Sequence, residues 1–467
     1  IIAFAVYWLC RTVYLSFHLR SGYKKMQEYQ NVDWLAKLKQ TQNWERIYHL
    51  VIIPTYRESA DILRQTILSL VHSDYPRQKM IVVLGIEQSL GKEADQKAAL
   101  LEQEFGNSFF RFLVTRHPQN LLGEIPGKGS NESFAARLAH ETIVQKQSIK
   151  DENVIVTSLD ADTVVYPRYF SCLAYKYCTV EDPTHASFQP VPLFLNNVWQ
   201  APAFSQIFSF SSTFWHTMNQ ERPEKLITFS SHSMSLKALV DVGFKQTNVV
   251  SDDSRIFWQC FLKYDGNYRV EPLYYPVSMD ATLAATFWQT LKHMYYQQKR
   301  WAYGVADIPY FLFGFLKNPR IRLSRRFSLG MELIEGHWSW ATSSIILFSF
   351  GWLPVVLGRG DFSNTLLSYN LPRLTSSMLT LAMLGLLGSV MISIKLLPPR
   401  PPGYPKWKMV LFVGQWLLFP FTMIFFTGLP ALEAQTRLLL GKYMGFWSTP
   451  KFRAKSKDLV TQGEALS

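Results

Sequence analysis

Short apolar runs recur through residues 44–300, separated by stretches whose apolar positions follow helical spacing. The runs are rich in Val, Ile, Leu and Phe and end at polar turns, as buried strands do. They predict strands at 49–56, 80–84, 110–115 and 154–159 and a helix at 59–72. Strands that alternate with helices predict an α/β fold, with a mainly parallel sheet covered by helices on both faces.

Three longer runs contain no charged residue. They are Trp338–Leu357, Leu374–Ile394 and Met409–Leu432. A bilayer core of ~30 Å needs about 20 apolar residues in a helix, and each run is that long. Buried core helices are the alternative, but three such runs in close succession favour an α-helical transmembrane region.

The chain begins with nine apolar residues, and Arg11, Arg20, Lys24 and Lys25 follow them. A signal peptide carries its positive charge before the apolar stretch, not after it. We interpret residues 1–20 as the end of a transmembrane helix whose start we expect before residue 1. Its basic flank predicts that the next 300 or so residues are cytoplasmic in an integral protein of the plasma or inner membrane.

The topology at the other end stays open. The only charged residues in the segment 358–373 are Arg359, Asp361 and Arg373. Because cytoplasmic loops are rich in Lys and Arg, this segment is predicted to lie on the outer side of the membrane. Three full membrane crossings would then place the basic C-terminal tail on the outer side as well, although basic segments favour the cytoplasmic side. Because Pro420 divides the last run, a re-entrant hairpin that returns to the cytoplasm is the alternative.

The net charge of +13 comes largely from Lys and Arg beside the apolar runs. Attraction to anionic lipid headgroups explains that placement, and no nucleic-acid motif appears. A lipid bilayer is therefore a predicted partner and nucleic acid is not. The four cysteines are Cys10, Cys172, Cys178 and Cys260. They lack zinc-site spacing, so free thiols are expected.

Two pairs of acidic residues stand at positions suited to chemistry. Asp160 and Asp162 directly follow a predicted strand, where two carboxylates can face one divalent cation bound to a phosphate. Such a tripeptide is more often a solvated turn. Asp252 and Asp253 precede an amphipathic helical run and can cap it, and a carboxylate in that place can also act as a general base.

The ordered motifs resemble those of family 2 glycosyltransferases, especially the membrane-embedded branch that includes cellulose and hyaluronan synthases. They are Pro-Thr-Tyr-x-Glu at 54–58, Gly-Lys-x-x-Asn at 127–131, Asp-Ala-Asp at 160–162, Asp-Asp at 252–253 and Gln-x-x-Arg-Trp at 297–301. Phe-Trp-Ser-Thr-Pro-Lys at 446–451 is similar to the gating loop of cellulose synthases. The resemblance implies a Rossmann-like GT-A domain and a metal-dependent, inverting transfer from a UDP-sugar.

The resemblance also implies roles for individual residues. The expected nucleotide-sugar ligands are Thr55, Tyr56, Glu58, Lys128, Asn131 and Asp160. Asp162, with Asp160, would hold Mg²⁺ or Mn²⁺, and Asp253 would be the base with Asp252 beside it. The expected acceptor and diphosphate contacts are Gln297, Gln298, Arg300, Trp301 and Lys451. An indole face suits a sugar ring, although a Trp anchored at the membrane interface is the alternative for Trp301.

One position departs from the family pattern. Where members carry Asp-Asp-Gly after the second strand, this chain reads Gly85-Ile86-Glu87, and Glu87 is the expected substitute. The specificity for the nucleobase is therefore open. Ser231–Ser235 stands where acceptor contacts usually lie, and its unusual sequence leaves the acceptor unnamed.

These patterns predict five segments. They are a partial transmembrane helix at 1–20, a cytoplasmic GT-A domain at 44–286, interfacial helices at 287–335, transmembrane helices at 336–432, and a gating-loop-like segment with a basic tail at 433–467. The leading hypothesis is a processive polysaccharide synthase whose helices pass the growing glycan. The alternatives are one-sugar transfer to a lipid or short glycan and a non-catalytic membrane scaffold. Whether accessory export subunits bind this protein is left open.

Overall fold

A single mixed sheet organises residues 48–278 of the chain. The computed structural model describes residues 2–350, 353–358 and 365–453, and within them eight strands pair in the order β3-β2-β1-β4-β7-β6-β8-β5. The predicted strands are confirmed as β1 (Tyr48–Pro54), β2 (Met80–Glu87), β3 (Arg111–His117) and β4 (Val154–Ser158). β1 lies between β2 and β4 and is parallel to both.

The second half of the sheet differs from the predicted parallel arrangement. It consists of β5 (Val164–Val165), β6 (Ala186–Leu193), β7 (Ser233–Ser235) and β8 (Arg269–Ser278). β6 and β8 are parallel, but β7 is antiparallel to both β4 and β6 and joins the two halves. With three small or polar residues, β7 is too short to leave a periodic signal in the sequence, so the mixed character of the sheet was missed.

Helices cover both faces of the sheet, as predicted. Side chains alternate along β1, so Val51 and Ile53 enter one apolar core while Leu50 and Ile52 enter the other. The first core includes side chains of α3 (Ala60–Val71), α4 (Gly91–Phe105) and α6 (Tyr169–Thr179). The second includes side chains of α5 (Lys128–Ala139), α8 (Leu236–Asp241) and α9 (Asp252–Lys263).

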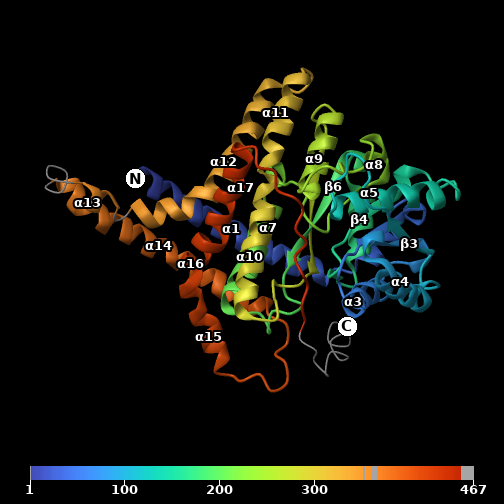
Figure 1. Cartoon of the computed structure of the whole chain (residues 1–467), viewed down its shortest axis with the longest axis horizontal. Coiled ribbons are helices and arrows are strands. Elements are labelled where there is room, and N and C mark those ends of the chain that lie inside the picture. Colours follow the sequence, from blue (N-terminus) through green and yellow to red (C-terminus); the bar gives the residue numbers. More distant parts are fainter. Residues whose placement is uncertain (1, 351–352, 359–364, 454–467) are drawn as a thin grey trace.

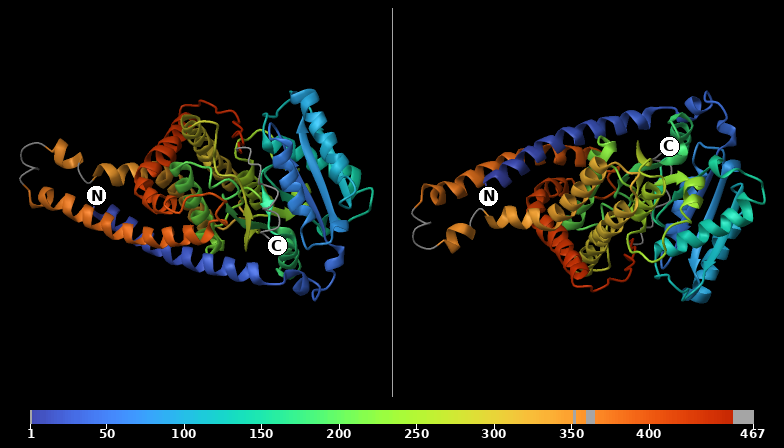
Figure 2. Two further views of the ribbon diagram at one scale, coloured as in Figure 1. Left: turned by 90° about the horizontal axis from the view of Figure 1, so that it is seen from below. Right: turned by 90° about the horizontal axis from the view of Figure 1, so that it is seen from above.

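Long helices extend away from the sheet as an arm (Figures 1 and 2). They are α1 (Ile2–Asn31), α12 (Leu323–Phe350) and α14 (Leu366–Leu396), with the short α13 (Leu353–Leu357) near the tip. α1 continues beyond the predicted boundary at residue 20 because Leu19, Tyr23 and Met26 enter an apolar cluster with residues of β6 and of α7 (Ala203–Gln220).

Two helical stretches of the described chain have the length and apolar composition to cross a bilayer, Ile2–Asn31 and Lys408–Leu439. Length and composition alone do not establish a membrane location. The second stretch comprises α15 (Lys408–Gly414), α16 (Phe419–Met423) and α17 (Leu429–Leu439), joined by single irregular helical turns. The predicted run 338–357 corresponds to parts of α12 and α13, and residues 351–352 within it lie outside the described residues.

The remaining helices connect the sheet to the arm. They are α2 (Trp34–Leu38), α7 (Ala203–Gln220), α10 (Phe287–Ala302) and α11 (Asp307–Lys317). After α17 the chain turns back, and residues 441–453 run as an extended segment toward the sheet (Figure 1). This return brings the C-terminal part of the described chain to the carboxyl ends of the strands.

The close approach of α5 to β2 at Gly85 generates a testable prediction. A Cβ added there would lie 2.2 Å from Asn131 Oδ1. We expect Gly85→Ala to lower the free energy of unfolding by about 1–3 kcal/mol, because overpacking forces side chains and backbone apart. Gly336→Ala is the matched control, since no atom other than its chain neighbours and its own helix backbone lies within 4 Å of the added Cβ. Equal unfolding midpoints for the two variants in detergent would contradict the predicted packing.

A buried histidine makes stability depend on pH. His49 in β1 is fully buried, between the rings of Tyr75 at 4.5 Å and Phe170 at 4.9 Å. Burial lowers the pKa of His49 from 6.5 to about 3. Below pH 6.5 the unfolded state binds the proton and the folded state does not, so stability falls as the pH drops. Linkage predicts a loss of about 2 kcal/mol at pH 5.

His49→Phe keeps an aromatic ring and removes this proton. We therefore expect the unfolding midpoint of the variant to change less between pH 7 and pH 5 than that of the wild type. Thermal or denaturant unfolding followed at both pH values measures the difference. An identical pH response would show that His49 is not the group that binds the proton.

Candidate active site

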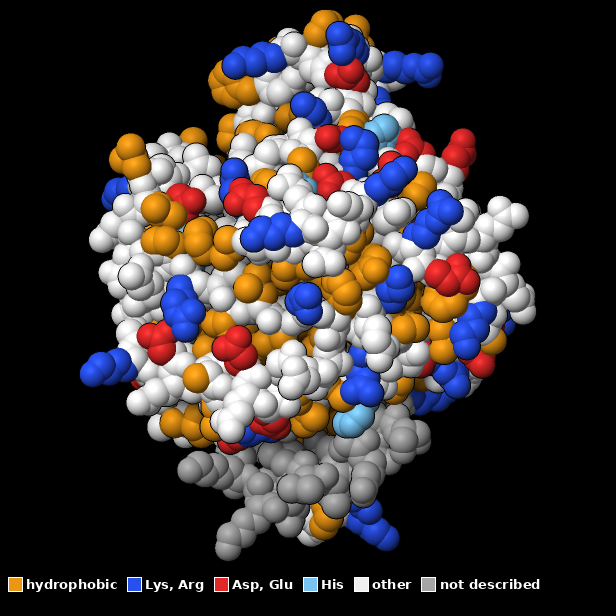
Figure 3. Space-filling view, turned by 90° about the vertical axis from the view of Figure 1, so that its right-hand side faces the viewer, with side chains coloured by type: hydrophobic (Ala, Val, Ile, Leu, Met, Phe, Trp, Pro, Cys, Tyr) orange, Lys and Arg blue, Asp and Glu red, His pale blue; other side chains and the backbone are white. Residues whose placement is uncertain are grey.

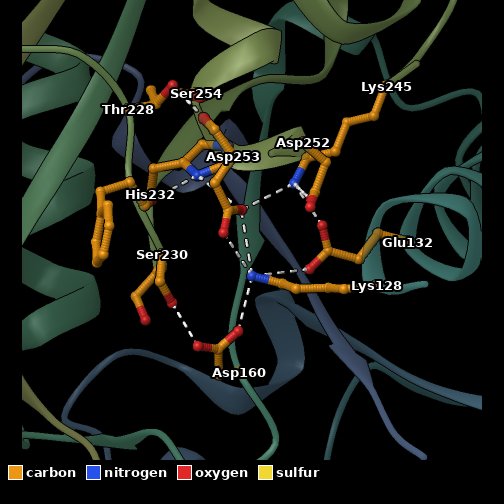
Figure 4. Close-up of polar contacts among 12 residues, drawn as sticks. Lys128, Glu132, Asp160, Thr228, Ser230, His232, Lys245, Asp252, Asp253 and Ser254 are labelled. Carbon is orange, nitrogen blue, oxygen red and sulfur yellow. Dashed lines mark hydrogen bonds and ion pairs between the residues drawn. The ribbon is translucent and has the colours of Figure 1, made fainter. Parts of the chain in front are cut away.

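The acids that the sequence places far apart meet at one lysine. Lys128, the first residue of α5, has its ammonium 2.7 Å from Asp160 Oδ1 and 3.0 Å from Asp253 Oδ2 (Figure 4). Asp160 follows β4, and Asp253 lies in the first turn of α9. The carboxyl end of a strand and the N-termini of two helices therefore place three charged side chains around one point. Ser230 donates a further hydrogen bond to Asp160 Oδ2, at 2.7 Å.

A second lysine contacts the same group of acidic side chains. The Lys245 ammonium forms a close ion pair with Glu132 and lies 3.2 Å from Asp252 and 3.3 Å from Asp253 (Figure 4). Lys245 and Glu132 are both buried and were missed by sequence reasoning, because each stands alone rather than in a motif. The only signal in the sequence for Glu132 was weak, namely that it follows Lys128 by one helical turn.

The two lysines set the ionisation of this cluster. Burial alone would raise the pKa of Asp253, but the charges of Lys128 and Lys245 outweigh it and hold the pKa far below its usual range. Glu132 is more deeply enclosed, and burial raises its pKa to about 7 despite both lysines. Burial, with the charge of Lys245, lowers the pKa of His232 to about 3, so this residue stays neutral beside the acids.

Acidic oxygens of Glu132, Asp252 and Asp253 lie within 4.8 Å of one another, a spacing that could hold a cation. The predicted metal residues Asp160 and Asp162 are not in this group. Lys128 and Lys245 already supply positive charge to it. The group therefore has a structural explanation that needs no metal.

Asp162 offers a better position for a cation. Its side chain is fully buried, and its Oδ2 accepts hydrogen bonds from the Lys451 ammonium at 2.6 Å and from the Asp280 N–H at 3.0 Å. Among the described residues, Asp162 Oδ1 has no hydrogen-bond partner. A buried carboxylate with one free oxygen, whose other oxygen faces an ammonium, fits a divalent cation bound to phosphate.

The segment after α17 covers the carboxylate of Asp162. Lys451 and Arg453 pair with Asp162 and Asp280, and the Asp280 side chain is almost fully buried. Burial would lower the pKa of Lys451, but Asp162, Asp160 and Asp280 raise it, so the ammonium stays charged. Asp280 follows β8 as Asp160 follows β4, and that shared position at a strand end could have identified it from the sequence.

The predicted nucleotide ligands line the same edge of the sheet. The Thr55 N–H donates to the Gly85 carbonyl at 2.7 Å, and Glu58 accepts from the Tyr56 N–H at 2.7 Å. Burial raises the pKa of Glu58. Glu87 also lies here: its Oε1 accepts a hydrogen bond from Asn131 at 2.9 Å.

His117, which ends β3, contacts the second oxygen of Glu87 at 3.0 Å and Glu124 on its other ring nitrogen, also at 3.0 Å. Both oxygens of Glu87, the residue expected to substitute for the family aspartate, are therefore held by hydrogen bonds. His117 was missed by sequence reasoning, although it too stands at the end of a predicted strand.

The Gln-x-x-Arg-Trp residues lie at the C-terminal end of α10. Gln297 accepts a hydrogen bond from the Thr282 hydroxyl at 2.5 Å, and Gln298 is buried. The Arg300 guanidinium stacks over Phe446 at 4.9 Å, and burial lowers its pKa. Phe194, Phe208 and Phe229 surround Trp301, with ring centroids 5.5 to 6.3 Å away. Trp301 thus lines the site rather than an outer surface.

One cavity of about 1570 Å³ contains these groups. It reaches from Thr55 and Asp162, past Asp253 and Trp301, to the apolar helices. All the predicted site residues line it. The lining that comes from α1, α7 and α12 includes aliphatic side chains such as Leu15 and Leu347. It also includes aromatic and small hydroxyl side chains, namely Trp8, Thr12, Ser16, Trp215, Ser339, Trp340 and Ser343.

Comparisons with solved structures give distant similarities. The mannosyltransferase PcManGT from Pyrobaculum calidifontis, in complex with GDP-Man and Mn²⁺, is 14% identical with a TM-score of 0.47, over 95% of this chain and 99% of that one. Residues 1–349 of S. aureus TarS, in complex with UDP-GlcNAc, are 11% identical with a TM-score of 0.38, over 85% of this chain and 93% of that one. No curated protein matches the chain.

A family comparison is decisive. The model described as glycosyl transferase family group 2 matches residues 155–427, which is more than half of the chain. The match begins at β4, just before Asp160 and Asp162, and includes Asp253 and the Gln-x-x-Arg-Trp residues. The chain is therefore a glycosyltransferase that belongs to glycosyl transferase family group 2.

Proposed function

We propose that this enzyme transfers a sugar from a nucleoside-diphosphate sugar, probed first as a UDP-sugar, to a glycan acceptor with inversion at C1. The acceptor is extended repeatedly, and the product leaves through the apolar helices, which lie in a plasma or inner membrane with the sheet domain in the cytoplasm. The proposal rests on the position of Lys128. Its ammonium contacts both Asp160, the carboxylate expected on the donor side, and Asp253, the expected base, within one cavity.

The donor would bind along the carboxyl edge of β1, β2 and β4. Thr55, Tyr56 and Glu87 face the nucleoside, and Lys128 and Arg300 face the diphosphate. Asp162 and Asp160 would hold Mg²⁺ or Mn²⁺, which when bound offsets the charge of the departing diphosphate. Lys451 must then leave Asp162, and its ammonium is free to pair with the diphosphate instead.

Asp253 is the proposed base. It accepts the proton of the acceptor hydroxyl as that oxygen bonds to C1 of the sugar and the bond from C1 to the diphosphate breaks. With Lys128 and Lys245 in contact, its carboxylate is ionised but weakly basic. A bound diphosphate attracts Lys128 away from Asp253, so donor binding would strengthen the base at the moment it is needed.

The acceptor side of the cavity supports repeated addition. Trp301 lines the same cavity as Asp253, and the path that continues among the apolar helices includes aromatic rings and hydroxyls in its lining. Aromatic faces pack on the C–H faces of sugars and hydroxyls bond to their oxygens, so a glycan fits this lining. One-sugar transfer to a lipid or short glycan is the alternative, since the same path ends among apolar helices.

We expect Asp253→Asn to lower the rate of transfer by roughly 10²–10⁴-fold, because the amide cannot accept the proton. The measurement is UDP release from a panel of radiolabelled UDP-sugars by purified membranes. Asp95→Asn, in an exposed carboxylate on α4, is the matched control and should retain full activity. Near-normal turnover of Asp253→Asn would rule out this base.

The length of the radiolabelled product tests the rest of the proposal. Long polymers formed before the acceptor pool is consumed support repeated addition. A product that gains a single sugar supports the alternative, and it would leave the donor chemistry unchanged.

A further inference from the structure

We propose that Lys245 and Glu132 are positioning residues for the transfer reaction. Lys245 stays on the base when the nucleotide binds, and Glu132 takes up a proton from solvent at the same step. The inference rests on the proposed function, in which a bound diphosphate attracts Lys128 away from Asp253. The side chains of Lys245 and Glu132 are only 5% and 2% exposed, and within the described chain they lie outside the lining of the large cavity.

The two lysines of the site differ in their freedom to move. Lys128 lines the cavity, and its ammonium contacts Asp160, on the proposed donor side, at 2.7 Å. Lys245 lies in the loop after α8, and the side chain of Gln259 on α9 forms hydrogen bonds to the backbone on both sides of it, each at 3.1 Å. Because its backbone is held and its side chain is enclosed, Lys245 remains in contact with Asp253 when Lys128 turns to a ligand.

The departure of Lys128 changes the charge balance of the buried cluster. Glu132, Asp252 and Asp253 place carboxylate oxygens within 4.8 Å of one another, and Lys245 then faces these three acids without Lys128. Charged side chains on the outer face of the sheet domain are spread apart and reach water (Figure 3). Water does not separate the buried acids in this way, and like charges so close together disfavour full ionisation. One of the acids is therefore expected to bind a proton.

Glu132 is the acid whose surroundings favour that proton. Its Oε2 forms the close ion pair with Lys245. Its Oε1 has no hydrogen-bond partner among the described residues and lies 3.7 Å from the Lys128 ammonium. Burial raises the pKa of Glu132 to about 7 even with both lysines present, and loss of a nearby positive charge raises it further. The proton forms an O–H bond on Glu132 and is released when the product leaves and Lys128 returns.

Asp252, Asp253 and His232 also face this cluster. Asp253 keeps its contact with Lys245 and is the more exposed acid, with 22% of its side chain accessible. His232 lies 3.7 Å from Asp253 and stays neutral, because burial lowers its pKa to about 3. Asp252 is the competing site for the proton, because burial raises its pKa as well. It differs from Glu132 in lining the cavity, so the experiment must separate these two acids.

The proposal makes nucleotide binding depend on pH. Because the pKa of Glu132 is higher with the nucleotide bound than without it, the bound state holds more protons than the free state near pH 8. By linkage, the affinity for the nucleotide then falls as the pH rises above about 7. Lys245 keeps Asp253 ionised through the same step, so the base can still accept the proton of the acceptor hydroxyl.

Calorimetric titration of the purified full chain with UDP and Mg²⁺ measures this proton. The heat of binding at pH 8 is compared in HEPES and Tris, which release different heats when they lose a proton. A terminal phosphate loses its second proton at a pKa of about 6, so UDP itself exchanges almost none. We expect the wild type to take up roughly 0.4 proton or more per UDP, and Glu132→Gln close to none. Glu141→Gln, exposed in the turn after α5, is the matched control and should behave like the wild type.

The outcomes separate the inference from the proposed function. UDP that does not bind to the wild type contradicts the proposed function itself. Binding without proton uptake, or equal uptake by the wild type and Glu132→Gln, overturns the inference alone. Uptake that persists in Glu132→Gln and disappears in Asp252→Asn assigns the proton to Asp252 and also overturns it. The wild type gives a check that needs no variant: its Kd for UDP should rise at least about threefold from pH 7 to pH 9, and an unchanged Kd would count against Glu132.

A second experiment tests Lys245. Lys245→Met combined with Glu132→Gln removes both charges of the ion pair, and UDP binding shows that the protein is folded. We expect the acid limb of the kcat profile to move up by about one pH unit or more, because Asp253 loses a contacting ammonium, while KM for the UDP-sugar changes less than kcat. Lys245→Arg keeps the charge and should keep the limb near its wild-type position. A profile of the double variant that coincides with that of Glu132→Gln alone would overturn the role of Lys245.

Discussion

The architecture of the site depends on burying several carboxylates close together. Asp160, Asp253, Asp252 and Glu132 would repel one another in a low-dielectric interior, and Lys128 and Lys245 make their approach possible. Lys128 contacts both Asp160, on the proposed donor side, and Asp253, the proposed base, so its position couples the two. The N-terminal turn of α5 must then lie against β2 and α9, which explains why Gly85 and Gly129 leave no room for a side chain. A charge constraint thus determines local packing.

Much of the fold could be predicted because its signals are local. Apolar runs identified β1 to β4, and the positions of Asp160 and Asp162 at a strand end indicated which edge of the sheet they occupy. Lys245 and Glu132 could not be found in this way, because a lone charged residue carries no pattern until the chain folds around it. β7 was missed because three residues are too few to show a period.

The apolar helices show a different limit of sequence reasoning. The composition of Met409–Leu432 predicts that it meets lipid, but an apolar run does not specify its direction. That direction depends on contacts with α7 and α10 and on the return of Lys451 to Asp162. The same return segment links the helices to catalysis, because it closes over the carboxylate proposed to hold the metal. The cavity that begins at that carboxylate ends between the helices, so the apolar helices and the proposed chemistry belong to one structural unit.

The central claim is that Asp162 and its neighbours form a nucleotide site that depends on a divalent cation. Calorimetric titration of the purified protein with UDP, in the presence and absence of Mn²⁺, tests it most directly. We expect Mn²⁺ to tighten UDP binding at least about tenfold, which is ~1.4 kcal/mol, and Asp162→Asn to abolish that gain while Asp95→Asn retains it. A flat titration of the wild type, or an undiminished gain in Asp162→Asn, would contradict the account.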